Sequence, residues 1–231
     1  MVAALANPAR EPQRLLATAD QARKLEGLAR GVRIEIVEGG EIARAIGQQN
    51  AVHQGVALAA PALEPLTIDE IGDPAEGVLL VLDQVTDPQN VGAIFRSAAA
   101  FGARGVVLQD RHAPPFTGAL AKAAAGALEK IPAARVTNLS RALERLTDLG
   151  WRTVGLAGGA EADLDAVLDG GPTVLVLGSE GEGMRRLVSE HCDVLARIPM
   201  PGGFESLNVS SAAAVALYEA ARRFRARAAG E

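Results

Sequence analysis

From residue 77 onward, short and almost continuous apolar runs alternate with longer stretches whose apolar residues recur at helical spacing. The apolar runs include GVLLVLDQV (77–85), GVVLQD (105–110) and PTVLVLG (172–178), and helical stretches such as 88–102 and 118–130 stand between them. Strands buried on both faces of a parallel sheet have this uninterrupted apolar character, and the helices between them provide the crossovers. The pattern therefore predicts an α/β fold, with a mostly parallel sheet and helices on both of its faces.

The chain before residue 77 has a different organisation. Strand-like runs at 33–38 and 55–60 flank a helical stretch at 41–50, which predicts a small α/β domain. The segment PALEPLTIDEIGDPAEG that follows carries three prolines and five acidic residues, a composition typical of a linker. We predict a small domain over residues 1–60, a linker over 61–75 and a larger domain over 76–231.

The composition limits the classes of function that this chain can have. A single cysteine, Cys192, excludes an intramolecular disulfide and leaves no cysteine cluster for zinc. The first apolar run, MVAAL, is too short for the core of a signal peptide, and no later run approaches the length that spans a membrane. We therefore expect a cytoplasmic protein with no membrane partner. The net charge of −5 argues against a protein coated in nucleic acid.

The first of three unusual loops leads into the helix expected over 88–102. Its apolar residues Val91, Ile94, Phe95 and Ala98 form one stripe, and Arg96 falls about 150° from the centre of that stripe. Arg96 is therefore not a core residue, and from the helix alone it is either an ordinary exposed arginine or a functional one. Asn90 lies near the helix start, where capping is the default role of an asparagine.

The other two loops follow later strands. VLVLGSEGEGM (174–184) has three glycines in six positions, which allow close approach of a ligand, but it matches neither the common phosphate loop nor the dinucleotide fingerprint. Glu180 in this loop could simply favour the positive end of a helix. In IPMPGGFESLNVSSAAAVALYE (198–219), polar residues bracket a helix start, namely Ser206, Asn208, Ser210 and Ser211, and each serine taken singly is most simply a cap or a small packing residue.

Taken together and in order, the three loops resemble the signature motifs of the SpoU-type branch of the SPOUT superfamily of RNA methyltransferases. NVGAIFRSAAAFG, VLVLGSEGEGM and the segment 198–219 match its first, second and third motifs over about 130 residues. The resemblance implies a deep trefoil knot in the C-terminal part, an exception to the rule that chains avoid threading loops. It also implies a homodimer whose active site draws on both chains.

The same resemblance assigns roles to individual residues. Gly178, Ile198 and Leu207 match positions that hold S-adenosyl-L-methionine, largely through backbone groups, with Met200 and Ser206 nearby. The residues that the resemblance implies to be catalytic are Arg96, Asn90, Glu180 and Asn208. No metal is implied.

Arg96 is the residue that the resemblance implicates most directly in methyl transfer to a ribose 2′-oxygen. Arg96 is either the proton acceptor or a cation beside the developing alkoxide, and the second role is easier because a guanidinium deprotonates only at very high pH. Asn90, Glu180 and Asn208 would then shape the site and orient Arg96 and the ribose.

The N-terminal segment ending NAVHQGVALAA resembles the domain, similar to ribosomal protein L30e, that binds RNA substrate in members acting on ribosomal RNA. Relatives carry a further strand and helix start before the equivalent of LANPAR, so this domain is expected to be incomplete at its N-terminus. The expected substrate is RNA, namely a guanosine of 23S rRNA. The alternatives are tRNA, or a catalytically silent knotted protein that binds RNA.

Overall fold

The computed structural model describes residues 1–29, 31–47, 53–116, 118–203 and 206–230, and the chain divides into two compact units, Met1–Glu64 and Pro65–Glu231. Residues 48–50, the end of the helical stretch expected at 41–50, and residues 204–205 of the third loop lie outside the described part. Each unit has a hydrophobic core of its own.

The first unit is a small α/β structure built on a three-stranded sheet. Its sheet has the order β2-β1-β3, with β2 parallel and β3 antiparallel to the central strand. Leu5, Leu15 and Leu25 form the buried centre of the unit. The elements are α1 (Val2–Ala6), β1 (Arg14–Ala17), α2 (Ala19–Leu25), β2 (Ile34–Ile36), α3 (Gly39–Ile46) and β3 (Val56–Ala59).

The second unit contains a seven-stranded sheet in the order β6-β5-β4-β9-β7-β10-β8. Every paired neighbour in this sheet runs parallel, and the central strands β4 and β9 are buried along their whole length. The predicted parallel α/β fold is therefore confirmed. The strands are β4 (Val78–Leu82), β5 (Gly105–Gln109), β6 (Ala133–Val136), β7 (Arg152–Leu156), β8 (Ala162–Asp163), β9 (Thr173–Leu177) and β10 (Val194–Arg197).

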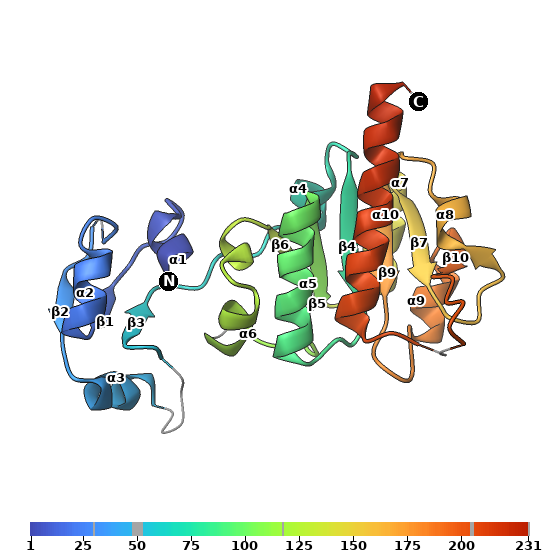
Figure 1. Ribbon diagram of the computed structural model, residues 1–231. Helices are drawn as coiled ribbons and strands as arrows, with labels where there is room; N and C mark the ends of the chain where they lie inside the picture. The colour runs from blue at the N-terminus through green and yellow to red at the C-terminus, as the bar shows by residue number, and fades with distance from the viewer. Residues whose placement is uncertain (30, 48–52, 117, 204–205, 231) are drawn as a thin grey trace. The chain divides into compact units, whose positions relative to one another are not determined.

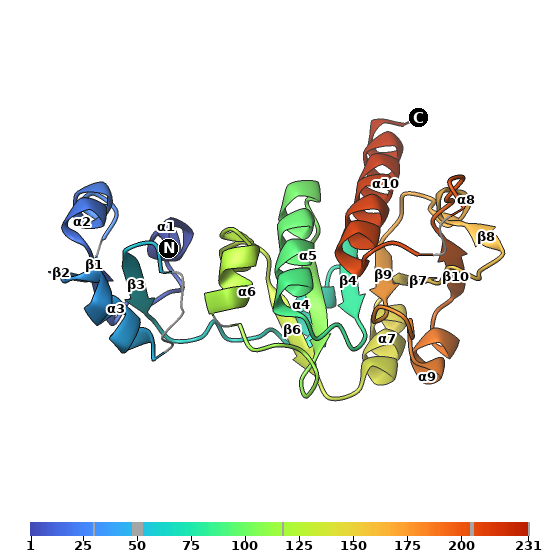
Figure 2. The same ribbon diagram turned by 60° about the horizontal axis from the view of Figure 1, so that its bottom comes forward.

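Helices cover both faces of this sheet, as Figures 1 and 2 show. One face carries α5 (Pro88–Phe101), α6 (Gly118–Ala123) and α10 (Val209–Ala229), and the other carries α4 (Ile68–Gly72), α7 (Leu139–Asp148) and α9 (Arg186–Glu190). Alternation along β4 divides the core between the faces, because Leu80 and Leu82 pack beneath α5 and α10 while Leu79 and Val81 pack beneath α7. The remaining elements are η1 (Ala127–Glu129) and α8 (Leu164–Val167).

Two local departures from the sequence prediction have clear causes. The stretch 61–75 was predicted as a linker, but it contains α4, whose N-terminus is fixed by a capping box between Thr67 and Glu70. The single helix predicted over 118–130 ends at Ala123, because Ala125 and Gly126 adopt positive φ angles of 49° and 91°.

Small residues allow the last helix to lie close to its neighbours. α10 packs along α5 and over the middle of the sheet, and Ala213 and Ala216 in that contact are fully buried. The chain leaves β10, near one edge of the sheet, and returns to its centre as α10 (Figure 1). The segment 198–208 makes this return.

Candidate active site

Several segments that the sequence analysis singled out lie at the carboxyl edge of the parallel sheet. Gly178 directly follows β9 and Ile198 directly follows β10, and parallel strands place such positions along one edge. α5 and α10 both begin at this edge, which lies at the bottom of the second unit in Figure 1. Asn90, in the first turn of α5, and Asn208, before the first residue of α10, therefore come to the same place as the glycine loop.

Asn90, Glu180 and Asn208 are joined by side-chain hydrogen bonds, which we call the amide–carboxylate network. The Nδ2 group of Asn90 donates to Oε1 of Glu180 at 3.1 Å, and the Nδ2 group of Asn208 donates to Oδ1 of Asn90 at 3.0 Å and also to Oε1 of Glu180. The backbone N–H of Val209 lies 3.3 Å from the same carboxylate oxygen. The network thus connects three segments that are far apart in the sequence.

Asn208 also caps α10. Its Oδ1 accepts hydrogen bonds from the backbone N–H groups of Ser210 at 3.0 Å and Ser211 at 3.4 Å, and from the hydroxyl of Ser210 at 2.6 Å. Oδ1 is therefore occupied at the helix start, which leaves Nδ2 pointing to Glu180 and Asn90. Capping by Asn208 and its place in the network are compatible, because they use different atoms.

Gly178 is required by the tight turn that carries Glu180. A Cβ atom on Gly178 would lie 2.0 Å from the carbonyl carbon of Gly183, so any larger residue would displace the backbone. Within the turn, the N–H of Ser179 donates to the carbonyl of Gly183 and the N–H of Gly183 donates back, at 3.1 and 3.0 Å. Gly183 itself has φ of 70°, a region that glycine adopts readily.

The third loop presents apolar side chains beside this turn. Leu207 is 40% exposed, and Ile198 and Met200 are half-buried. Among the described residues, no hydrogen bond engages the backbone N–H or C=O of Leu207. An exposed apolar side chain with free backbone groups next to it suits a ligand that has both an apolar ring and polar edges. Ser206 is exposed and immediately precedes Leu207.

Arg96 lies outside the amide–carboxylate network. It is exposed on α5, and within the described part of the chain its side chain makes no hydrogen bond or ion pair. The separation of six residues places it about 9 Å along the helix from Asn90. As the sequence indicated, Arg96 points away from the apolar stripe, and it is free to contact another molecule.

One ion pair at this edge was not predicted from the sequence. Asp83 directly follows β4 and is fully buried, and Arg185 ends the glycine loop and pairs with its carboxylate at 2.8 Å. No local signal could have identified the pair, because 102 residues separate its partners.

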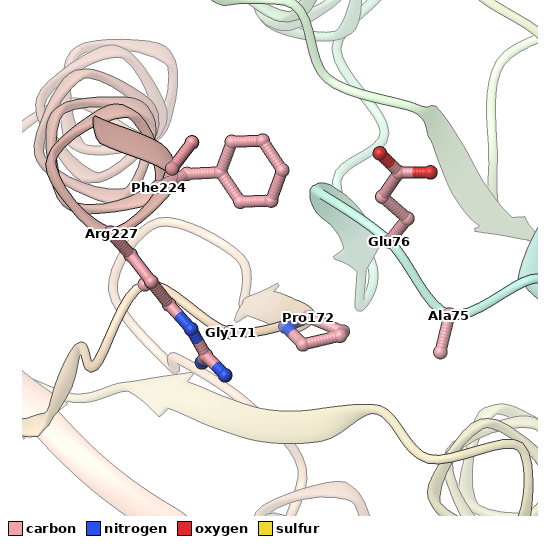
Figure 3. Close-up of a pocket in the computed structure, with 8 residues that line it drawn as sticks. Ala75, Glu76, Gly171, Pro172, Phe224 and Arg227 are labelled. Carbon is pink, nitrogen blue, oxygen red and sulfur yellow. The ribbon is translucent and has the colours of Figure 1, made fainter. Parts of the chain in front are cut away.

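Among the described residues, no group of three His, Cys, Asp or Glu side chains could hold a metal ion. A pocket of about 340 Å³ lies at the opposite, amino edge of the sheet, between α10 and the segments before β4 and β9 (Figure 3). Its lining is formed by Ala75, Glu76, Gly170, Gly171, Pro172, Phe224, Arg227 and Ala228.

No described helix has the length and apolar character needed to cross a membrane.

Comparison with known sequences gives matches over most of the chain. The family model for SpoU rRNA methylases matches residues 77–218. The chain is 48% identical over 177 residues to the 23S rRNA (guanosine-2′-O-)-methyltransferase RlmB of Pseudomonas syringae pv. tomato, a match that covers 74% of this chain and 71% of that protein. It is 44% identical over 181 residues to an uncharacterized tRNA/rRNA methyltransferase of Mycolicibacterium smegmatis, covering 76% of this chain but only 58% of that relative.

Solved structures share the architecture. The SpoU methyltransferase AviRb from Streptomyces viridochromogenes, in complex with AdoMet, superposes with a TM-score of 0.80 at 26% identity, covering 96% of this chain and 86% of that one. An AdoMet-bound rRNA methyltransferase from Sinorhizobium meliloti gives a TM-score of 0.79 at 28% identity, covering 96% and 84% of the two chains.

Proposed function

We propose, from the premise that this chain belongs to the SpoU rRNA methylase family, that it transfers a methyl group from S-adenosyl-L-methionine to a ribose 2′-oxygen of RNA. The observation that carries the proposal is the amide–carboxylate network of Asn90, Glu180 and Asn208 at the carboxyl edge of the sheet. Ligands of open parallel sheets collect at that edge.

The residues around the glycine turn fit the proposed cofactor. We assign Gly178, Ile198 and Leu207 to its binding, with Met200 and Ser206 nearby. Leu207 offers an exposed apolar side chain and free backbone groups to an adenosine, as the described part of the chain shows no bond to that backbone. When bound, S-adenosyl-L-methionine would supply a methyl group already activated by a sulfonium sulfur.

The protein's part in the reaction is alignment and charge stabilisation. The reaction joins the ribose oxygen to the methyl carbon and breaks the carbon–sulfur bond, whose electrons stay on sulfur to leave a neutral thioether. The proton of the ribose hydroxyl passes to solvent water. Arg96 stabilises the negative charge that develops on the oxygen, because a guanidinium keeps its proton at any physiological pH. Asn90, Glu180 and Asn208 hold the walls of the site in place around the ribose.

A homodimer would bring Arg96 to this site from a second chain. Arg96 is exposed and stands apart from the network of its own chain. On α10, next to α5, Val215 and Tyr218 are 43% and 51% exposed, and Tyr218 contacts Phe101 of α5 edge to face. An exposed apolar surface of this kind suits a symmetric contact, which would complete two sites at once.

The C-terminal domain is proposed to be knotted and the N-terminal unit to be an L30e-like domain that binds the RNA. The return of the chain from β10 to the centre of the sheet through 198–208 supports the knot. The three-stranded α/β structure of Met1–Glu64 supports a separate binding module.

The chain spans about 58% of the length of the mycobacterial relatives. We propose that its substrate is a guanosine of 23S rRNA and that it acts in the cytoplasm.

Radiolabelled methyl transfer tests the activity and the substrate together. Unmodified fragments of 23S rRNA and unmodified tRNA are offered in parallel, and the labelled ribose is mapped. Transfer to a guanosine of the rRNA supports the proposal, and transfer to tRNA alone would replace the substrate while keeping the reaction. Binding of S-adenosyl-L-methionine without transfer to either RNA would instead identify a silent RNA-binding protein.

Arg96→Ala links the activity to the proposed site. We expect transfer to fall by about 100- to 1000-fold while the cofactor still binds, because one stabilising contact to the developing charge is removed. Arg141→Ala is the matched control: Arg141 is exposed on α7, on the other face of the sheet, and its side chain makes no bond within the described residues. Equal activity of the two variants would remove Arg96 from the mechanism.

A further inference from the structure

Asp83 is a buried carboxylate that the proposed reaction does not use. It is 0% exposed, and its backbone N–H donates to the carbonyl of Leu177, the last residue of β9, at 2.8 Å, which adds one bond to the pairing of β4 with β9 directly after the end of β4. A buried charge is costly unless it is paired and hydrogen-bonded. Asp83 therefore requires a cationic or hydrogen-bonding partner at this edge of the sheet.

Arg185 satisfies both oxygens of that carboxylate. Its Nε donates to Oδ1 of Asp83 at 2.9 Å and its backbone N–H donates to Oδ2 at 2.8 Å. A second guanidinium nitrogen, Nη2, lies 2.8 Å from Oδ1 and donates to Oε1 of Gln109, the last residue of β5, at 3.3 Å. Arg185 thus ties the ends of β4 and β5 to the end of the glycine loop, in a geometry that a point charge cannot reproduce.

The pair lies at one end of each of two segments that the network also joins. Asp83 begins the loop that leads to Asn90, and Arg185 ends the loop that carries Glu180. Asn90 and Glu180 are then hydrogen-bonded to each other at 3.1 Å. The glycine loop is attached to β9 at one end and held by Arg185 at the other, and two backbone hydrogen bonds close its turn. The position of Glu180 therefore depends on where Arg185 holds the loop.

We propose that Asp83 and Arg185 are positioning residues, which hold the glycine loop so that Glu180 meets Asn90 and Asn208 in the geometry that methyl transfer requires. This inference rests on the proposed function for its kinetic consequence. The alternative is a purely structural ion pair, whose loss would lower stability without a specific effect on the reaction.

Arg185→Lys separates the two roles. Lysine keeps a positive charge beside the buried carboxylate, but it cannot bond Asp83 through two side-chain nitrogens and also reach Gln109. We expect the variant to fold, to keep its KM for RNA within about twofold, and to lose about 10- to 100-fold in kcat, because small misplacements of catalytic groups have effects of that size. A wild-type kcat in Arg185→Lys would overturn the proposal.

The matched control is Arg152→Lys. Arg152 begins β7 at the opposite edge of the sheet, its side chain is 39% exposed against 40% for Arg185, and it also pairs with an aspartate, Asp169, at 3.6 Å. We expect its kcat to stay at the wild-type level. A loss equal to that of Arg185→Lys would show that any such arginine matters, and would overturn the assignment.

A double-mutant cycle tests whether Arg185 acts through Glu180. If it does, Arg185→Lys lowers kcat in the wild type but has little further effect in the Glu180→Gln background, because the group it positions is already altered. Multiplicative losses of kcat would show that the two residues act independently, and would overturn the proposal.

Hydrogen exchange distinguishes failure of this inference from failure of the proposed function. The amides of residues 178–184 are expected to exchange faster in Arg185→Lys than in the wild type, while those of α7 stay unchanged. This readout needs no RNA, so it tests the positioning even if no RNA is methylated by the wild type. Unchanged exchange over 178–184 would overturn the positioning role.

Discussion

Asn208 offers a direct test of how the site is built, because its two side-chain atoms have separate tasks. Oδ1 caps α10 by accepting from Ser210 and Ser211, and Nδ2 donates to Asn90 and Glu180. Asn208→Ser keeps a capping oxygen but removes both Nδ2 bonds. Asn208→Ala removes the cap as well. The two variants together separate helix capping from the network.

The expected changes in the free energy of unfolding follow from these contacts. Each Nδ2 bond contributes about 0.5–1.5 kcal/mol net, and the exposure of the network puts the loss at the lower end, so Asn208→Ser should cost about 1–2 kcal/mol. Asn208→Ala should cost about 1 kcal/mol more, the usual effect of losing an N-cap. Methyl transfer should fall to the same level in both, because both lose the network.

Asn208→Asp adds an electrostatic test. The aspartate keeps the cap and suits the positive end of α10, but its second oxygen faces the carboxylate of Glu180. Two unit charges about 4 Å apart repel by about 1 kcal/mol in water and about 4 kcal/mol near a protein surface. We therefore expect Asn208→Asp to open the network and lose more activity than Asn208→Ser.

Urea unfolding and methyl-transfer assays on the three variants check this reasoning. The slope of unfolding free energy against urea should match the wild type, which would show that only stability has changed. The reasoning is refuted if Asn208→Ser retains full activity, or if Asn208→Asp is as active as the wild type.

Three other predictions concern single positions. Gly178→Ala should abolish tight binding of S-adenosyl-L-methionine in calorimetry, because the added Cβ would meet the backbone of Gly183 at 2.0 Å; wild-type affinity would contradict this. Trp151→Phe should lower the free energy of unfolding by about 1–3 kcal/mol in urea, and leave methyl transfer unchanged, because it removes the buried bond from the indole N–H to the carbonyl of Gly72 at the far edge of the sheet. Burial raises the pKa of Cys192 from 9.0 to about 12, so a thiol reagent at pH 8 should react slowly with the folded protein and rapidly with the protein unfolded in urea. The contribution of this neutral thiol to the free energy of unfolding is complete below about pH 9 and is lost as the pH rises toward 12.

The fold of the second unit was predictable because its signals are local. Uninterrupted apolar runs such as 78–82 identify buried strands. The helix α5 is capped by Asp87, begins at Pro88 and is followed by Gly102, which adopts φ of 72°. The break after Ala123 was not predictable from helix propensity, because the alanine-rich segment favours a helix and only the packing beneath α5 decides otherwise.

The candidate site was only partly accessible to the sequence. Asn90, Glu180 and Asn208 were grouped through the resemblance of their motifs, and the structure places them within hydrogen-bonding distance of one another. Helical spacing gave the direction of Arg96, but not its separation from those three. The pair of Asp83 and Arg185 depends on the meeting of segments 102 residues apart, for which a single sequence carries no periodic signal.

The two roles of the Asn208 side chain affect how the candidate site responds to heating. The first turn of α10 and the amide–carboxylate network share one side chain, so fraying of that turn releases the amide from Glu180 and Asn90 before the core is disturbed. The proposed methyl transfer should then be lost at a lower temperature than that at which the sheet melts. The start of the last helix, rather than the core, sets the upper temperature at which this protein can work.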